Sequence, residues 1–192
     1  MNIINGRIAV LFFSSLLFAQ GLWADPRSAE MLSHTCAGCH GTNGVSAGGP
    51  MPVIAGMSKR YISRALNEYE RGGSPATIMG RIARGYSDLE IEAIATYFAG
   101  QNWQSQAEMK PNSKLVKQGQ AIHNEQCETC HIDGGRGGKD PDMPRIAGQY
   151  PDYMYNLLVD FHTIGTTLSQ PREMRLRIEK LNSEELQALS QF

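Results

Sequence analysis

A five-residue motif, Cys-Ala-Gly-Cys-His, occupies positions 36–40 of the chain and recurs as Cys-Glu-Thr-Cys-His at positions 127–131. Two thiols separated by two residues and followed directly by an imidazole form the pattern for covalent attachment of a c-type haem. The histidine of such a motif reaches the iron as an axial ligand. We therefore expect two covalently bound haem c groups, the first held by Cys36, Cys39 and His40 and the second by Cys127, Cys130 and His131.

Two other sites also use the pattern Cys-x-x-Cys, namely redox-active dithiols and one half of a zinc site. The histidine that follows directly, and the repetition of the whole motif, favour haem attachment over both. The two motifs together use all four cysteines of the chain, so none is left for a structural disulfide or a nucleophile.

An apolar stretch lies near the N-terminus, at positions 8–18, with Arg7 before it and the small residue Ala24 a few positions after it. This arrangement is typical of a secretory signal peptide, which we expect at residues 1–24 with cleavage after Ala24. An uncleaved N-terminal anchor is the alternative. Export agrees with the haem motifs, because haem of this kind is attached outside the cytoplasmic membrane. We expect a periplasmic protein with no stable membrane span after cleavage.

The charges of the chain are nearly balanced, with 18 Lys and Arg against 19 Asp and Glu among 192 residues. No run of basic residues is present that would follow a phosphate backbone. Nucleic acid is therefore not an expected partner.

The chain aligns with itself beyond the two motifs. The segment Met-Pro-Val-Ile-Ala-Gly at 51–56 matches Met-Pro-Arg-Ile-Ala-Gly at 143–148, and the offset between matched residues grows only slowly along the chain. One unit has thus been duplicated. We predict two tandem all-α domains, at residues 25–100 and 113–192, with a polar linker at 101–112.

Each copy follows the same predicted order of helices. A helical stretch (28–35 and 113–126) leads into the motif, a Gly- and Pro-rich loop follows, and a helix with an apolar stripe comes next. The last helix begins with a capping box, Ser87 with Glu90 and Asn182 with Glu185. The second of these helices has only a few residues before Phe192, so it is either brief or truncated. Units this small are stabilised only marginally by an apolar core, and we expect covalent haem to be required for folding.

A second axial ligand is expected for a haem that only transfers electrons, and a methionine thioether is a common choice. The duplication leaves two matched pairs, Met79 with Met174 and Met51 with Met143. Met79 and Met174 lie far enough from the histidines for the chain to pass to the opposite face of the ring, so we assign them as ligands. The other pair lies in the loop on the histidine side, where the carbonyl groups of Pro52 and Pro144 are placed to accept a hydrogen bond from the ligating histidine.

The remaining histidines, His34, His123 and His162, have no histidine at the matching position of the other copy, so we expect surface or supporting positions for them. Arg81 and Arg84 near Met79 are candidates for pairing with haem propionates or a partner, or are simply solvated charges.

Several segments resemble one family closely: CAGCHGTNG, ATIMGRIARGYSDLE around Met79, then CETCH, RIAGQYPDYMYNLLVDF and PREMRLRIEKL. The chain is similar over nearly all of its mature length to the dihaem cytochrome subunit of flavocytochrome c sulfide dehydrogenase. The resemblance implies an electron-accepting, non-catalytic subunit that binds an FAD-containing flavoprotein, where sulfide is oxidised, and passes the electrons to a further soluble cytochrome. It also implies two tandem cytochrome c folds related by pseudo-twofold symmetry. The ligand sets given above follow from it as well, with Met79 on the first haem and Met174 on the second.

Two other functions are considered. A free dihaem shuttle cytochrome that feeds a terminal oxidase would share both motifs and the duplication. A haem enzyme such as a peroxidase needs an open iron position, which two well-placed methionines argue against.

Overall fold

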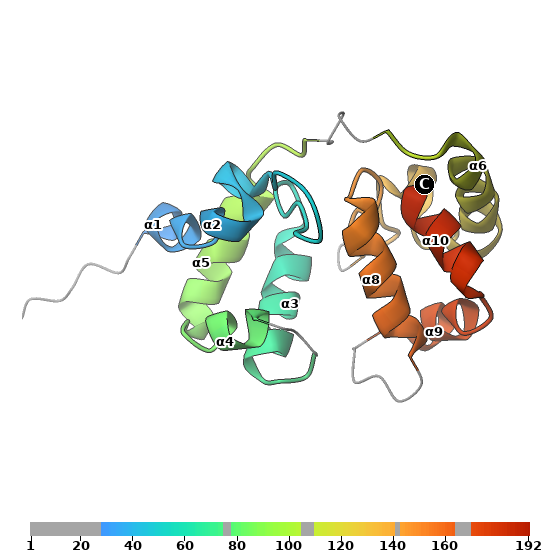
Figure 1. Cartoon of the computed structure of the whole chain (residues 1–192). Coiled ribbons are helices and arrows are strands. Elements are labelled where there is room, and N and C mark those ends of the chain that lie inside the picture. Colours follow the sequence, from blue (N-terminus) through green and yellow to red (C-terminus); the bar gives the residue numbers. More distant parts are fainter. Residues whose placement is uncertain (1–27, 75–77, 105–109, 141–142, 164–169) are drawn as a thin grey trace, which may run out of the picture.

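The computed structural model describes residues 28–74, 78–104, 110–140, 143–163 and 170–192. All regular structure within these ranges is helical, so the predicted all-α class is confirmed. Figure 1 shows two helical units joined by one linker. The predicted signal peptide, residues 1–24, lies outside the described residues. No helix in the described ranges is both long enough and apolar enough to cross a bilayer.

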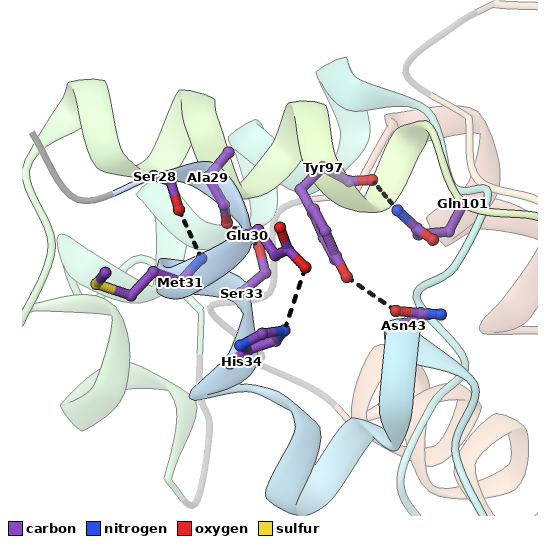
Figure 2. A network of polar contacts seen from close by, with 9 residues as sticks. All are labelled: Ser28, Ala29, Glu30, Met31, Ser33, His34, Asn43, Tyr97 and Gln101. Atoms are coloured by element: carbon purple, nitrogen blue, oxygen red, sulfur yellow. Dashed lines mark hydrogen bonds and ion pairs between the residues drawn. The ribbon is translucent and has the colours of Figure 1, made fainter.

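The first unit begins with a short helix that runs directly into the first cysteine motif. Its described elements are α1 (Ala29–His34), α2 (Ala37–His40), the 3-10 turn η1 (Thr42–Gly44), α3 (Lys59–Glu70), α4 (Met79–Ala83) and α5 (Asp88–Ala99). The Ser28 hydroxyl starts α1 by accepting a hydrogen bond from the backbone N–H of Met31 at 3.1 Å, which Figure 2 shows. The predicted helical stretch before the first motif is confirmed.

The second unit repeats this order with local differences. Its described elements are α6 (Ser113–Ile122), the π-helical turn η2 (His123–Cys127), the irregular turn α7 (Ile132–Gly135), α8 (Pro151–His162), α9 (Arg172–Ile178) and α10 (Ser183–Gln191). The helical stretch predicted before the second motif is therefore present, but its last turn is π-helical. A widened turn of this kind is rare and often lies at functional sites.

Both predicted capping boxes are present. The Ser87 hydroxyl accepts from the backbone N–H of Glu90 while the Glu90 carboxylate accepts from that of Ser87, and Asn182 and Glu185 do the same. Two of the orphan amides in each first turn are satisfied in this way. The helix that follows has 12 residues in the first unit and nine in the second.

Each unit has its own apolar core. Leu32, Ile62, Ile94 and Phe98 are buried together with Met57 and Ala95 in the first unit. Leu158, Ile178, Leu181 and Leu186 form a smaller cluster in the second. The apolar stripes predicted on α3 and α8 face these clusters, because Ile62 lies in α3 and Leu158 in α8.

The two units meet through α3, α8 and the loops before these helices, which lie at the centre of Figure 1. The side-chain amide of Gln149 makes two hydrogen bonds to the backbone of Val53, at 3.0 and 2.6 Å. The Tyr150 hydroxyl donates to the carbonyl oxygen of Ser46 at 2.8 Å. These contacts are buried, so the units form a specific interface in addition to the linker.

The linker also contributes to this interface. The Arg145 guanidinium lies over the indole ring of Trp103, 4.7 Å from its centroid. A cation at this distance from a ring face is attracted by the negative π-surface. Trp103 itself packs against the buried cluster of Val53, Ala55 and Tyr150, which contains residues of both units.

Candidate haem sites

The first cysteine motif folds into a single helical turn. Cys36 is the N-cap of α2, and Cys39 and His40 lie within it. Residues three apart in a helical turn share one face, so both thiols are presented on the same side. The chain then continues into η1, where the Tyr97 hydroxyl of α5 donates to the Asn43 side chain at 2.8 Å (Figure 2). The loop after the motif is thereby attached to the last helix of the unit.

The imidazole of His40 is held in the form that a metal ligand requires. Its Nδ1 lies 2.9 Å from the carbonyl oxygen of Pro52, as predicted, and its side chain is only 8% exposed. Burial lowers the pKa of His40, and the hydrogen bond to Pro52 opposes this effect. A neutral ring that donates from Nδ1 leaves the Nε2 lone pair available for iron.

The second histidine is less firmly fixed. Burial lowers the pKa of His131, and the Pro144 carbonyl acts in the opposite direction. This carbonyl is close to the ring, but Nδ1 of His131 makes no hydrogen bond of normal geometry. The two units therefore share the arrangement of histidine and proline but differ in how well the hydrogen bond is formed.

All four cysteines lie in the described part of the chain, and none is joined to another by a disulfide. Burial raises the pKa of Cys36 and raises that of Cys127 to about 11, although Arg177 acts against the second shift. Reactive redox dithiols instead have a lowered thiol pKa. Neither Cys36 nor Cys127 therefore has the lowered thiol pKa of an attacking redox cysteine.

A cavity of about 770 Å³ lies beside the second motif. Cys127, Cys130, His131 and Met174 all line it, so the structure brings together the four residues assigned to the second haem. Apolar side chains form much of the remaining wall, namely Leu157, Leu158, Phe161, Ile178 and Leu189. The volume is in the range of cofactor pockets, and the two thiols and the imidazole fit a covalently bound haem.

The structure says more about the candidate methionine ligands of the second haem than about those of the first. Met143 lines the same cavity as Met174, so position on the wall alone does not select between them. Met79 is the first residue of α4 and is partly buried. The described contacts do not include one between Met79 and His40, and residues 75–77, just before Met79, lie outside the described ranges.

His123 was predicted from the sequence only as a surface or supporting residue. It is fully buried and lines the cavity, whereas His34 is exposed and lies 3.8 Å from Glu30 (Figure 2). Nδ1 of His123 is 3.2 Å from a carboxylate oxygen of Glu128, which is within ion-pair distance. Neither ring nitrogen of His123, however, has a hydrogen bond of normal geometry. The duplication could have indicated that His123 is buried, because the matching residue of the first unit is the core residue Leu32.

Three tyrosines from both units line the cavity where the units meet: Tyr61 and Tyr69 from α3 and Tyr153 from α8. The hydroxyl groups of Tyr61 and Tyr153 are hydrogen-bonded to each other. Burial raises the pKa of each, to about 12 for Tyr69 and well above the usual value for Tyr153. The apolar stripe predicted for the first of these helices includes Tyr61 and Tyr69, whereas Tyr153 was not singled out from the sequence. Arg81 and Arg84, which it considered as partners of propionates, are exposed.

Comparison with known proteins agrees with this organisation. A family model described as Cytochrome c matches residues 27–102, and one described as Cytochrome C oxidase, cbb3-type, subunit III matches residues 114–192. Cytochrome c-552 of Acidithiobacillus ferridurans is 31% identical over 183 residues, which cover 83% of this chain and 78% of that protein. Cytochrome c4 of Pseudomonas aeruginosa is 28% identical over 93% of this chain and 94% of its own length.

A shorter and stronger similarity is found to a dehydrogenase subunit. The cytochrome subunit of sulfide dehydrogenase from Chlorobaculum tepidum is 49% identical over 69 residues, which cover 36% of this chain and 62% of that protein. Among solved structures, reduced recombinant cytochrome c4 from Pseudomonas stutzeri superposes with a TM-score of 0.74 at 26% identity. This match covers 85% of the chain and 96% of that structure.

Proposed function

Because the chain belongs to the cytochrome c family and is a dihaem electron-transfer protein with two haem c groups, we propose that each of its domains supplies one complete ligand set. Cys36 and Cys39 bind the first haem, with His40 and Met79 as iron ligands. Cys127 and Cys130 bind the second, with His131 and Met174 as iron ligands. The ligand set of the second haem is supported by the cavity that all four of its residues line. The internal duplication extends the assignment to the matching residues of the first unit. The proposed domain bounds are 25–100 and 113–192, after a signal peptide at 1–24.

Each haem iron, when bound, takes up and releases one electron. The chain's own residues hold the two groups in a fixed relation, since Gln149 and Tyr150 of the second unit are hydrogen-bonded to the first. Side chains of α3 line the cavity of the second haem, so that cavity extends to the first unit. This arrangement suits stepwise transfer of electrons between the units.

The specific role is that of the electron-accepting subunit of a flavoprotein sulfide dehydrogenase in the periplasm. The observation that carries this role is the 49% identity to the cytochrome subunit of sulfide dehydrogenase, well above the identity to the relatives that match at full length. A flavin that collects two electrons from sulfide can discharge one to each haem in turn. A further soluble cytochrome would then receive them.

A free dihaem shuttle cytochrome that feeds a terminal oxidase is the second candidate. The similarity over nearly the whole chain to proteins named cytochrome c4, and the superposition on one of them, favour this candidate.

Purification of the native protein from its source distinguishes the two roles. A dehydrogenase subunit is expected to co-elute with an FAD-containing protein, and sulfide is expected to reduce its haems only when that protein is present. A cytochrome that elutes alone, and whose haems are reduced by sulfide no faster when the flavoprotein fraction is added, would support the shuttle and contradict the subunit role.

A further inference from the structure

One peptide group of the first unit connects its haem-ligating histidine to the second unit. The carbonyl oxygen of Pro52 lies 2.9 Å from Nδ1 of His40. The N–H of Val53 donates to Oε1 of Gln149 at 3.0 Å. This carbonyl and this N–H are the two ends of the same planar amide. A continuous hydrogen-bond chain therefore runs from the imidazole of the first unit to a side chain of the second.

The surroundings of this chain make it strong. Val53 is fully buried and Gln149 is only 5% exposed, so little water competes for the hydrogen bonds. The Gln149 side chain also donates from Nε2 to the carbonyl oxygen of Val53, which fixes its amide in one orientation. In a medium of low dielectric constant, hydrogen bonds in series polarise one another, and each is strengthened by the next.

Among the described residues, the histidine of the second unit has no equivalent of this hydrogen-bond chain. The residue that matches Gln149 in the first unit is Met57, which packs in the core with Leu32 and Phe98. A thioether has no donor and is only a weak acceptor. The matching histidine, His131, is also the one whose Nδ1 lacks a well-formed hydrogen bond to its proline carbonyl. The better-formed histidine bond thus occurs in the unit whose peptide is held by Gln149.

We propose that Gln149 is a positioning residue for His40, the iron ligand assigned above, and that it lowers the reduction potential of the first haem. By accepting from the Val53 N–H, Gln149 polarises the Pro52–Val53 amide and makes the Pro52 oxygen a stronger acceptor. A stronger acceptor at Nδ1 raises the basicity of the imidazole and fixes its orientation. A more basic axial ligand stabilises the oxidised iron, so the second unit tunes the first.

The test is the substitution Gln149→Met in the complete dihaem protein, which installs the residue found at the matching position of the first unit. The potential of each haem is measured separately, by following its hyperfine-shifted NMR signals through a redox titration. We expect the potential of the first haem to rise and that of the second to stay unchanged. The ring N–H signal of His40 is expected to shift as its hydrogen bond weakens.

A second substitution separates the two hydrogen bonds of Gln149 and still allows a decision if Gln149→Met does not fold. Gln149→Glu retains an oxygen acceptor at the Val53 N–H and loses the donor to the Val53 carbonyl. Because a carboxylate is a stronger acceptor than an amide oxygen, the potential of the first haem is expected to fall in this variant. The ring N–H signal of His40 is expected to shift in the direction opposite to that in Gln149→Met. An unchanged ring N–H signal, or a rise in the potential, would show that the acceptor at Val53 is not the group that matters.

The matched control is Tyr150→Phe, which removes the neighbouring hydrogen bond to Ser46 across the same interface and leaves the chain from His40 to Gln149 intact. Both potentials are expected to stay unchanged. An unchanged first potential in Gln149→Met, or an equal rise in Tyr150→Phe, would overturn the proposal. Neither measurement uses sulfide or a flavoprotein, so this result is independent of the proposed partner.

Discussion

Gly119 and Ala188 lie where α6 and α10 cross, and a Cβ on Gly119 would come within 2.2 Å of the carbonyl oxygen of Ala188. The two backbones are in contact, so no side chain fits between them. We expect Gly119→Ala to lower the free energy of unfolding by about 1–3 kcal/mol, the usual cost of overpacking, with chemical denaturation as the measurement.

The control for this substitution is Gly100→Ala at the end of α5. Its added methyl group would meet its nearest atoms at 3.5 and 3.6 Å, an ordinary contact distance. This variant should unfold at nearly the wild-type denaturant concentration. Equal loss of stability in both variants would show that the close approach of α6 and α10 is not the cause.

His123 is the buried polar residue at a position where the first unit has Leu32. Because neither ring nitrogen has a well-formed hydrogen bond, the imidazole gives up hydration with little compensation. We expect His123→Leu to leave the free energy of unfolding unchanged or to raise it by about 1 kcal/mol. A loss of several kcal/mol would instead show that the contact with Glu128 stabilises the fold.

The high pKa of Tyr69 predicts a loss of stability in alkali. Burial is the main cause of the shift to about 12, and the nearby Tyr61, Glu68 and Asp160 add to it. The unfolded chain releases this proton near the usual value of about 10 and the folded protein only near 12. The unfolded state therefore binds fewer protons between these values. The stabilisation is complete below pH 10 and is lost as the pH rises through 12.

The size of this effect is about 2–3 kcal/mol at most, since one pKa unit corresponds to about 1.4 kcal/mol. Denaturation curves measured across this pH range should show stability falling more steeply in the wild type than in Tyr69→Phe. Parallel curves for the two proteins would contradict the assignment.

Covalent haem should be required for the second unit to fold. The cavity of about 770 Å³ occupies much of the space that a core would fill, and the buried cluster beside it contains four residues of the described ranges. In a variant with Cys127→Ser and Cys130→Ser, we expect the second unit to be cleaved rapidly by proteases and to lose its helical circular dichroism. A compact, protease-resistant second unit would contradict this expectation.

The sequence was sufficient to predict the features that depend on local chemistry. The cysteine motifs, the capping boxes at Ser87 and Asn182 and the duplication led to the all-α class and to two tandem domains. The hydrogen bond between His40 and Pro52 was also predicted, because a ligating histidine needs an acceptor for the N–H of its other ring nitrogen and the loop offers one nearby.

The interface between the units could not be predicted in the same way. Gln149 and Tyr150 occupy positions where the first unit has the core residue Met57 and the helix cap Ser58, and nothing local shows that their side chains cross to the other unit. Their partners, Val53 and Ser46, take part through backbone atoms, which every residue has, so the residue types at these positions do not indicate the contact. Contacts of this kind depend on how the surfaces of two folded domains pack against each other.

The ligand assignment at the centre of this account is tested most directly by replacing the methionines one at a time. In Met79→Ala and in Met174→Ala, we expect the methionine-to-iron absorption band to lose the contribution of one haem, and in the double variant to disappear. Met51→Ala and Met143→Ala are the matched controls and should keep the full band. An intact band in Met79→Ala or Met174→Ala, or its loss in Met51→Ala or Met143→Ala, would contradict the assignment.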